Sequence, residues 1–419
     1  MLKNPFYFLS SSILMSTAIA CTNQVEPTQS ETRIPDVSAD VSTICKEVTQ
    51  RYAYFTPRAD YWDETCERAK KEASTLKDSN GALAIFERMI DDLYDPHIAL
   101  NANNQNSPRL LPSGSDIWFE NRDGNYFVSA VRPLSGAAKA GIRIGDKFIR
   151  FNDLGPEELT LTRIHTVTNT TNIDRLTWAL NAAVAGRRSH PRNLEIERGG
   201  STRSFAMEAP DVPTSKDLIL SKVISEKIGY IRINNSLGKS ATVVAFNRAL
   251  ESLRETSGLI LDLRETPGGG NTSVAEPIMG RFVQKRTPYQ RTIMRNGSNE
   301  DREIKPTGSW TYDKPLIVLV GRWTGSMGEG MAIGYDGMSR AKILGSQMAG
   351  LAGGTEGIKL KETGISLALP TYDLGHLNGI SRHDWKPSEV DIADNGAGKD
   401  ILLRKAVSEF GQVDRLPSK

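Results

Sequence analysis

Two apolar segments that end in glycine-rich turns constrain the fold of this chain most strongly. One reads LILDLRETPGGGN over residues 259–271, and the other reads LIVLVGRWTGSMGEG over residues 316–330. Each begins with a short run of branched apolar residues and stops abruptly at turn-forming residues, which is typical of a buried strand followed by a loop. We expect both strands to belong to one sheet and to carry their loops to one edge of it.

The two loops contain residue types that suit acyl transfer. The second loop carries Ser326 at a strand-to-helix turn, and the first supplies Gly268 and Gly269 directly after Pro267. A serine at such a turn, next to a glycine-rich run of backbone N–H groups, is a common way to build a nucleophile and an oxyanion hole. The pattern therefore predicts acyl transfer, most simply the hydrolysis of a peptide bond.

The N-terminus reads as a secretory signal followed by a tether. Residues 1–21 begin with a positive charge at Lys3, continue with mostly apolar or small residues, and end in Ala-Ile-Ala before Cys21. This ending resembles a bacterial lipobox, which would make Cys21 the lipidated first residue of the mature chain; an ordinary signal with an incidental cysteine is the alternative. Residues 22–40 are polar and predict a flexible tether. We expect a protein anchored in the bacterial envelope on the periplasmic side, with the outer membrane preferred if the source is Gram-negative.

Charge and cysteine content bear on three questions: a nucleic-acid partner, a disulfide and a metal site. The chain has 52 Lys and Arg against 50 Asp and Glu, so nothing in the charge balance indicates a nucleic-acid partner. Beyond Cys21, only Cys45 and Cys66 remain, in apparently helical stretches on either side of a turn. They could form a disulfide in an oxidising compartment or stay as two buried thiols, and their spacing does not resemble a metal site.

The remaining sequence divides into three parts of a multidomain α/β (α+β) fold. Residues 41–110 form a predicted helical block, because apolar residues recur at three- and four-residue spacing in it. Residues 115–210 form a β-rich module whose segment 131–153 resembles the PDZ pattern of a small-residue helix, a Gly-Asp turn and an apolar strand. PDZ modules bind extended peptides by adding a strand to a sheet edge. Residues 220–410 alternate between predicted strands and helices and form an α/β core.

This order of parts resembles a known family. A helical block, a PDZ module and a core with LDLRETPGGG and TGSMGE resemble the C-terminal processing (tail-specific) proteases and their tricorn-core relatives, the serine peptidases of family S41. The resemblance covers nearly all of residues 44–395. It implies a crotonase-like (ClpP/S41) core, Ser326 as the nucleophile, an oxyanion hole from the amides of Met327 and a glycine of the 268–269 turn, and no metal or organic cofactor.

The general base is where this chain departs from the processing proteases. They use a lysine about 25 residues after the serine, and counting onward from Ser326 reaches Leu351, which cannot accept a proton. Lys359 and Lys361 follow at the wrong offset. The tricorn-like branch uses a histidine from the N-terminal block, which points to His97 as the base, although a structural role for His97 is the alternative. His383 is the second candidate for the base.

A serine–histidine pair normally needs a carboxylate that orients the imidazole and stabilises its charged form. The resemblance suggests Asp384 for this role, because it lies in a late loop that would return towards the serine. Glu329 is expected to brace the nucleophile helix rather than to transfer protons, and Arg264 and Glu265 are expected to brace the glycine loop.

The sequence thus favours a lipid-anchored serine endopeptidase acting on protein or peptide substrates, including their C-termini. A non-catalytic peptide- or ligand-binding protein on the same scaffold is the main alternative, since the lysine is missing. Another hydrolase, such as an esterase, is the third reading.

Overall fold

The computed structural model of the chain describes residues 35–76, 78–166, 172–212, 215–225, 227–389 and 400–413. The predicted signal, Cys21 and most of the predicted tether lie outside these residues. Within the described ranges, no helix combines the length and the apolar character needed to cross a membrane.

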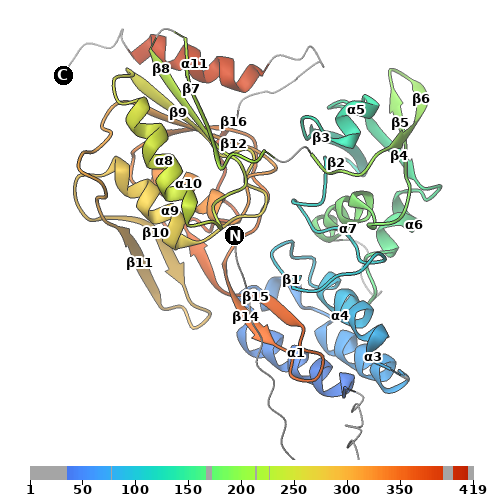
Figure 1. Ribbon diagram of the computed structural model, residues 1–419. Helices are drawn as coiled ribbons and strands as arrows, with labels where there is room; N and C mark the ends of the chain where they lie inside the picture. Colours follow the sequence, from blue (N-terminus) through green and yellow to red (C-terminus); the bar gives the residue numbers. More distant parts are fainter. Residues whose placement is uncertain are drawn as a thin grey trace, which may run out of the picture. The chain divides into compact units, whose positions relative to one another are not determined.

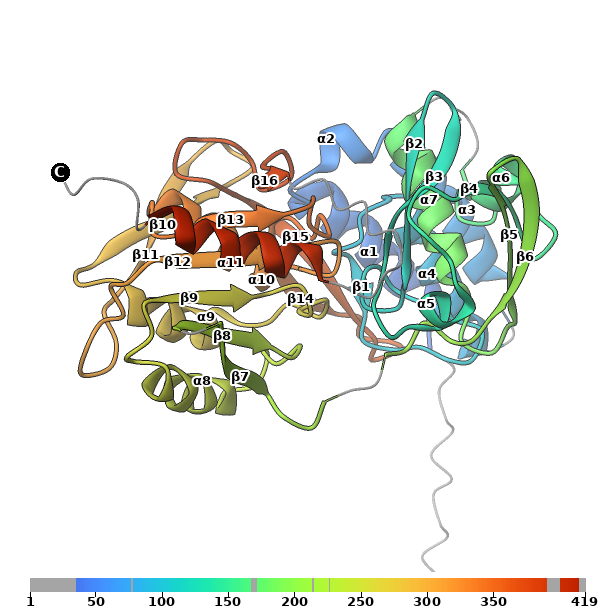
Figure 2. The ribbon, with the colours of Figure 1, turned by 90° about the horizontal axis from the view of Figure 1, so that it is seen from above.

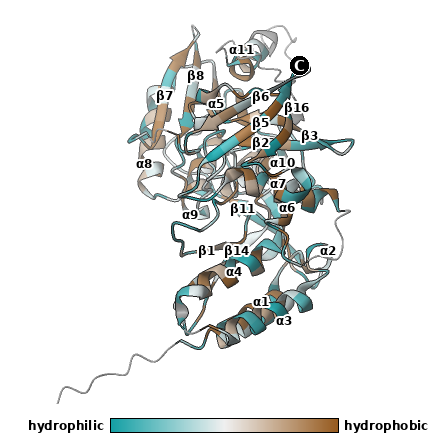
Figure 3. Cartoon of the chain, turned by 90° about the vertical axis from the view of Figure 1, so that its right-hand side faces the viewer, coloured by the Kyte–Doolittle hydropathy of each residue, from teal (hydrophilic) through white to brown (hydrophobic). Residues whose placement is uncertain are grey.

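The helical block begins earlier than the sequence predicts. Its first helix starts at Val37 instead of 41, because the Asp36 side chain accepts a hydrogen bond from the Ala39 amide and caps it. Figure 3 shows hydrophilic and hydrophobic residues alternating along α1 and α3, whose apolar sides form the core of the block. The helices of the block are α1 (Val37–Arg51), α2 (Phe55–Arg58), α3 (Trp62–Ser74), the short η1 (Ser79–Gly81) and α4 (Ala82–Asp91).

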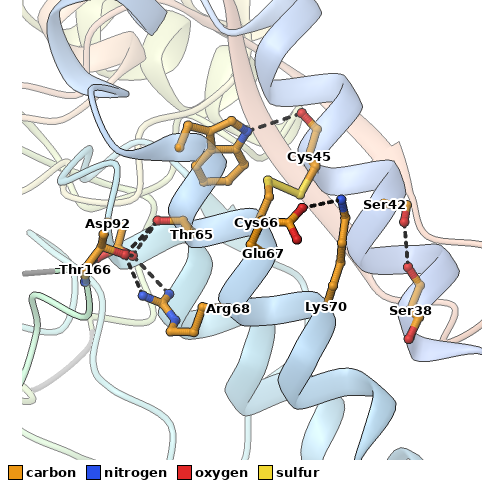
Figure 4. The surroundings of a disulfide bond; sticks show 11 residues. Ser38, Ser42, Cys45, Thr65, Cys66, Glu67, Arg68, Lys70, Asp92 and Thr166 are labelled. Atoms are coloured by element: carbon orange, nitrogen blue, oxygen red, sulfur yellow. Dashed lines mark hydrogen bonds and ion pairs between the residues drawn. A yellow bond between two sulfur atoms is a disulfide. The ribbon is translucent and has the colours of Figure 1, made fainter.

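A disulfide joins the first and third helices of this block. Cys45 of α1 and Cys66 of α3 are bonded, with their Cα atoms 6.0 Å apart (Figure 4). The Trp62 indole lies beside the bridge and donates to the Cys45 carbonyl over 3.3 Å. Of the two possibilities left open by the sequence, the structure therefore has the covalent bond.

The second part is a five-stranded antiparallel sheet with helices packed on it. Its strands run in the order β2-β3-β4-β5-β6. The short helix predicted at 136–140 is present as α5, and it ends at Gly141, whose φ of +88° is favourable for glycine. The elements are β2 (Ile117–Arg122), β3 (Asn125–Val131), α5 (Gly136–Ala140), β4 (Lys147–Phe151), α6 (Pro156–Leu161), α7 (Ile173–Ala185), β5 (Arg192–Arg198) and β6 (Ser201–Met207).

The core is built on a six-stranded sheet of order β16-β13-β12-β9-β8-β7, parallel except at the β7 edge. Strands β9 and β12 are buried along their whole length and lie next to each other, as the two apolar segments predict. Alternate residues of the sheet pack against α8–α10 on one face and against α11 on the other (Figure 2). The elements are β7 (Ile219–Ile224), β8 (Ile228–Ile233), α8 (Ala241–Ser252), β9 (Gly258–Asp262), α9 (Thr272–Met279), η2 (Gly280–Phe282), β12 (Leu316–Val320), α10 (Met327–Gly337), β13 (Lys342–Gly345), β16 (Ser388–Glu389) and α11 (Ile401–Val413).

A second sheet of the core extends to the helical block. Its strands are β1 (Ala99–Leu100), β10 (Thr287–Ile293), β11 (Asn299–Ile304), β14 (Gly354–Lys359) and β15 (Ser366–Gly375). Strand β1 belongs to the N-terminal block, yet it pairs antiparallel with β15, and both lie beside α1 in Figure 1. The β14–β15 hairpin adds apolar residues such as Leu360 and Leu367 to the core of the helical block. This long-range pairing joins the first hundred residues to the end of the core.

Buried charges join the helical block to the β module. The Asp92 carboxylate, just after α4, accepts hydrogen bonds from Thr65 and Arg68 of α3 and from Thr166 of the β module (Figure 4). Arg163 of the module pairs in the same way with Asp91 at 2.6 Å. These contacts fix the end of α4, six residues before His97.

The β module also contacts two loops of the core, the glycine-rich loop after β9 and the serine-containing loop after β12. Arg132 forms an ion pair of 2.9 Å with Glu265 in the glycine-rich loop. The Trp323 indole, just before the serine turn, donates to the Ser115 carbonyl over 3.0 Å. Glu265 thus braces the glycine loop by an ion pair to another module, whereas Arg264 pairs with Asp262 and Asp400 within the core.

Candidate active site

Ser326 lies at the sharp turn between β12 and α10. Its backbone has φ +49° and ψ −109°, a conformation that a non-glycine residue adopts at a cost of about 1–3 kcal/mol. Such strain persists only where neighbouring groups fix the backbone. The turn presents the hydroxyl at the carboxyl edge of the parallel sheet, where the sequence predicts it.

Two buried charged side chains of opposite sign hold the Ser326 backbone. The amide of Ser326 donates to the Glu329 carboxylate at 2.8 Å, and its carbonyl accepts from Arg382 at 3.1 Å. Arg382 also donates to Gln290 of β10, which fixes the guanidinium. The role expected for Glu329 is therefore supported by direct contact, and Arg382 is a partner that the sequence did not reveal.

Glu329 also connects the serine turn to the loop at residues 346–353. Its carboxylate accepts hydrogen bonds from the amides of Gly350 and Leu351 in addition to that of Ser326. Complete burial raises its pKa to about 7, although Arg382 and the three amides lower it. One carboxylate thus fixes two segments of the site relative to each other.

His97 reaches Ser326 from the helical block. The two atoms Nε2 of His97 and Oγ of Ser326 are 3.0 Å apart, and Nδ1 of His97 lies 2.7 Å from the Ala352 carbonyl oxygen. A carbonyl oxygen can only accept, so we assign the ring proton to Nδ1. The lone pair on Nε2 then faces the serine hydroxyl, which is the arrangement that a general base requires.

The position of His97 follows from the strand pairing described above. Two residues after His97, Ala99 pairs with Ala368 of β15, and Ala352 comes just before β14, the partner of β15 in the hairpin. The pairing of β1 with this hairpin therefore brings His97 to the Ala352 carbonyl, 255 residues away in sequence.

The surroundings keep His97 largely neutral near pH 7. Burial lowers the pKa of its imidazole below the usual value, and the charge of Arg382 lowers it further. The hydrogen bond to Ala352 and the charge of Asp95 act in the opposite direction. A neutral imidazole can accept the serine proton.

The glycine-rich loop lies directly against Ser326. A Cβ atom at Gly269 would be 2.5 Å from the Ser326 Cβ and 3.0 Å from its Oγ, and Gly269 has φ +62°. Only glycine fits this position without displacing the serine. The two loops are expected to lie close together because their strands are adjacent, and here they are in direct contact.

The amides expected in the oxyanion hole differ in whether they already donate a hydrogen bond within the protein. The Gly268 N–H donates to the Asn235 side chain at 2.8 Å, and the Gly269 N–H donates to the Thr266 carbonyl at 3.0 Å within its own turn. Both glycine amides expected to serve the oxyanion hole are therefore engaged in hydrogen bonds within the protein. The Met327 amide, the first of α10, donates to no residue in the described part of the chain.

Leu351 occupies the space beside the serine turn. It is buried, and its Cδ1 would lie 2.9 Å from a Cβ placed on Gly325. Lys359 of β14 and Lys361 after it are exposed, and neither hydrogen bonds to Ser326 within the described ranges. The position counted as that of the family lysine thus holds an apolar side chain in contact with the turn.

Asp384, which the resemblance suggests as the orienting carboxylate, has an exposed side chain, and within the described residues no hydrogen bond joins it to His97. The orienting contact is made instead by the Ala352 carbonyl, because the β14–β15 hairpin brings that carbonyl to Nδ1. His383 likewise bonds to Arg58, at 3.2 Å between Nε2 and Nη2, and not to the serine.

Three contributors to the site were missed by the sequence reasoning. They are Ala352, Arg382 and Asn235, which act through a backbone carbonyl, a buried guanidinium and a side-chain amide. Arg382 lies two residues before Asp384 in a segment that the sequence had singled out, but its charge alone gave no sign of burial. Among the described residues, no group of three or more His, Cys, Asp and Glu side chains is placed to hold a metal ion.

Comparisons with known proteins relate the core to one family. Residues 227–388 match the model of peptidase family S41. The chain is 26% identical over 263 residues to the carboxy-terminal processing protease CtpB of Bacillus subtilis, a match that covers 60% of this chain and 50% of the relative. It is 25% identical over 365 residues to a carboxy-terminal-processing protease of Bartonella bacilliformis, covering 82% of this chain and 74% of the relative. The chain thus spans about half the length of the Bacillus protein.

Solved structures share the fold across most of the chain. The mature form of CPAF covers 84% of this chain and 92% of its own, with a TM-score of 0.56 and 15% identity. The photosystem II D1 C-terminal processing protease covers 85% and 94%, with a TM-score of 0.54 and 16% identity. The solved structures thus share the fold, and the segment that is similar to peptidase family S41 lies at residues 227–388.

Proposed function

We propose that this chain is a lipid-anchored serine endopeptidase of the bacterial envelope that cleaves protein substrates through an acyl-enzyme on Ser326. The observation that carries the proposal is the contact of 3.0 Å between His97 Nε2 and Ser326 Oγ, with Nδ1 held by the Ala352 carbonyl. The relatives support a protein substrate, since they are named as processing proteases. Their names also suggest that cleavage occurs near a C-terminus.

In the first step, His97 Nε2 takes the hydroxyl proton while Ser326 Oγ attacks the scissile carbonyl carbon. The developing oxyanion is stabilised by the Met327 amide, and the Gly268 amide joins it when Asn235 releases its hydrogen bond. The imidazolium then gives its proton to the leaving amine, and the acyl-enzyme forms. Water, activated by the same imidazole, hydrolyses the ester and regenerates the serine.

The β module at residues 115–210 serves as a PDZ-like site for an extended segment of the substrate. Its five-stranded antiparallel sheet ends in an edge strand, β6, most of whose residues are exposed. An exposed edge offers backbone donors and acceptors to an added strand. The contacts of the module with Glu265 and Trp323 connect such a site to both loops around the serine.

Lipidation of Cys21 accounts for the lipobox-like sequence at the N-terminus. Replacement of this cysteine by serine should abolish incorporation of labelled fatty acid and move the protein from the membrane fraction to the soluble one. Unchanged incorporation in Cys21→Ser would refute the anchor without affecting the peptidase proposal.

The peptidase proposal is tested with the full-length protein in detergent micelles, using casein as an unfolded substrate and a fluorophosphonate as an active-site label. Wild type should cleave casein and incorporate the label, and Ser326→Ala should do neither while staying folded. Loss of both signals in wild type at every pH would identify a binding protein. Labelling and ester hydrolysis without cleavage of casein would identify an esterase.

A further inference from the structure

The environment of His97 contains a carboxylate that does not touch its ring. Asp95 is 5% exposed and lies two residues before His97 in the same turn. One of its oxygens accepts the His97 backbone amide at 2.9 Å, and the other accepts the hydroxyl of Tyr52 at 2.7 Å. Tyr52 is fully buried at the end of α1, so both carboxylate oxygens are fixed by groups with little freedom to move.

The ring of His97 lacks the partner that usually stabilises its charged form. Nδ1 is occupied by the Ala352 carbonyl, which orients the ring but carries no net charge. Proton transfer from serine creates an imidazolium ion, and a nearby negative charge stabilises this ion. Among the described residues, the negative charge of Asp95 raises the pKa of the ring and the positive charge of Arg382 lowers it.

We infer that Asp95 is a positioning residue for His97, fixing the turn that carries the imidazole and supplying, from outside hydrogen-bond contact, the negative charge that stabilises the imidazolium ion. The inference rests on the proposed role of His97 as the base. It takes the place of the role that the resemblance suggests for Asp384, since orientation comes from Ala352 and charge from Asp95.

Several titratable and charged groups from other elements face this turn and share the same field. Arg58 of α2 donates to the Tyr94 carbonyl and lies close enough to interact with the Asp95 charge. Arg382 opposes the effect of Asp95 on the ring, and Glu329 titrates on the other side of Ser326. Among the described residues, these groups include Tyr52, Tyr54, Arg58, Tyr94, Glu329, Asp373, Arg382 and His383.

The test measures the His97 pKa directly by NMR on full-length Ser326→Ala protein with ¹³C-labelled histidine. The chain has five histidines, and His97→Gln assigns the signal. Asp95→Asn keeps an oxygen for the His97 amide and a polar group for Tyr52, but it removes the charge. Because an opposite charge a few ångströms away shifts a pKa by about 1–3 units, we expect the His97 pKa to fall by about one unit.

Two matched substitutions show whether the effect is specific. Asp60→Asn removes an exposed charge from the turn between α2 and α3 and should leave the His97 pKa unchanged. Asp384→Asn tests the rival assignment. A shift in Asp384→Asn with none in Asp95→Asn would overturn the inference, as would no shift in either. If Asp95→Asn does not fold, the Asp95→Glu and Asp95→Gln pair replaces it, and an equal His97 pKa in both overturns the inference.

An activity measurement separates this inference from the proposed function. With Ser326 present, Asp95→Asn should slow fluorophosphonate labelling about tenfold. It should also move the acid limb of the plot of labelling rate against pH to lower pH. A merely structural role would slow labelling without moving the limb, and that result overturns the electrostatic part of the inference. If wild type is not labelled at all, the peptidase proposal fails, while the NMR titration still tests the effect of Asp95 on His97.

Discussion

Replacing Gly269 by alanine should disable the site far more than it destabilises the fold. An added Cβ would lie 2.5 Å from the Ser326 Cβ and 3.0 Å from its Oγ. Carbon atoms prefer separations of about 3.5–4.0 Å, so the serine or the glycine loop must move by about 1 Å. A displacement of about 1 Å from the reactive geometry can cost about a hundredfold in rate.

The backbone of Gly269 adds a separate cost to stability. Its φ of +62° disfavours alanine by about 1–2 kcal/mol. Gly364, in the turn between β14 and β15, has a similar φ of +72°, but a Cβ there would meet nothing within 4 Å. Gly364→Ala therefore carries the same backbone cost without contact with the serine.

The assay compares the two variants in the rate of fluorophosphonate labelling and in the free energy of unfolding by urea. We expect both to lose about 1–2 kcal/mol of stability, and only Gly269→Ala to lose about a hundredfold in labelling rate. Equal labelling rates in the two variants would show that the glycine loop does not lie against the nucleophile, which would refute the geometry of the site.

Three further predictions concern the groups that support the site. Cys45→Ser/Cys66→Ser should lower the free energy of unfolding in urea by about 3 kcal/mol, because the bridge closes a loop with a sequence separation of 21; an unchanged midpoint would argue against the bond. Burial disfavours the Asp92 carboxylate, but Arg68 and four hydrogen bonds outweigh this and hold its pKa below the usual range. The stability that Asp92 contributes is therefore present above its unfolded pKa of about 3.9 and is lost as pH falls through the lower folded value. Asp92→Asn should lower the Tm at pH 7 and reduce the fall of Tm in acid, as measured by thermal scans, and an identical acid profile would contradict the role. Glu329→Gln leaves one acceptor oxygen for several amides, so it should slow labelling of Ser326. Since the Glu329 pKa is about 7, the difference from wild type should grow from pH 6 to pH 8, and a constant ratio would contradict this account.

Local patterns predicted the parts of the site that depend on neighbouring sequence. The two apolar runs became adjacent buried strands, and the turns after them brought Gly269 to Ser326. The multidomain α/β fold also follows from such patterns, because helix and strand periodicities are local. Resemblance to a family branch points to His97, and its Nε2 lies within hydrogen-bond distance of the serine.

The parts that the sequence could not provide depend on contacts between distant segments. The Ala352 carbonyl reaches His97 because β1 pairs with β15, and no local pattern in residues 97–100 reveals that partner. A backbone carbonyl carries no residue-specific signal at all, so an orienting side chain, Asp384, was expected instead. The engagement of the Gly268 amide by Asn235 is a similar case, since it joins two loops 33 residues apart.

The most direct test of the central claim is the pH dependence of Ser326 labelling by a fluorophosphonate in wild type and His97→Gln, both full-length and folded. If His97 removes the serine proton, wild type should show a rate that rises with pH through the His97 pKa, and His97→Gln should be slower by a factor of about 10²–10⁴. Labelling of His97→Gln at the wild-type rate, with the same pH dependence, would contradict the assignment of His97 as the base.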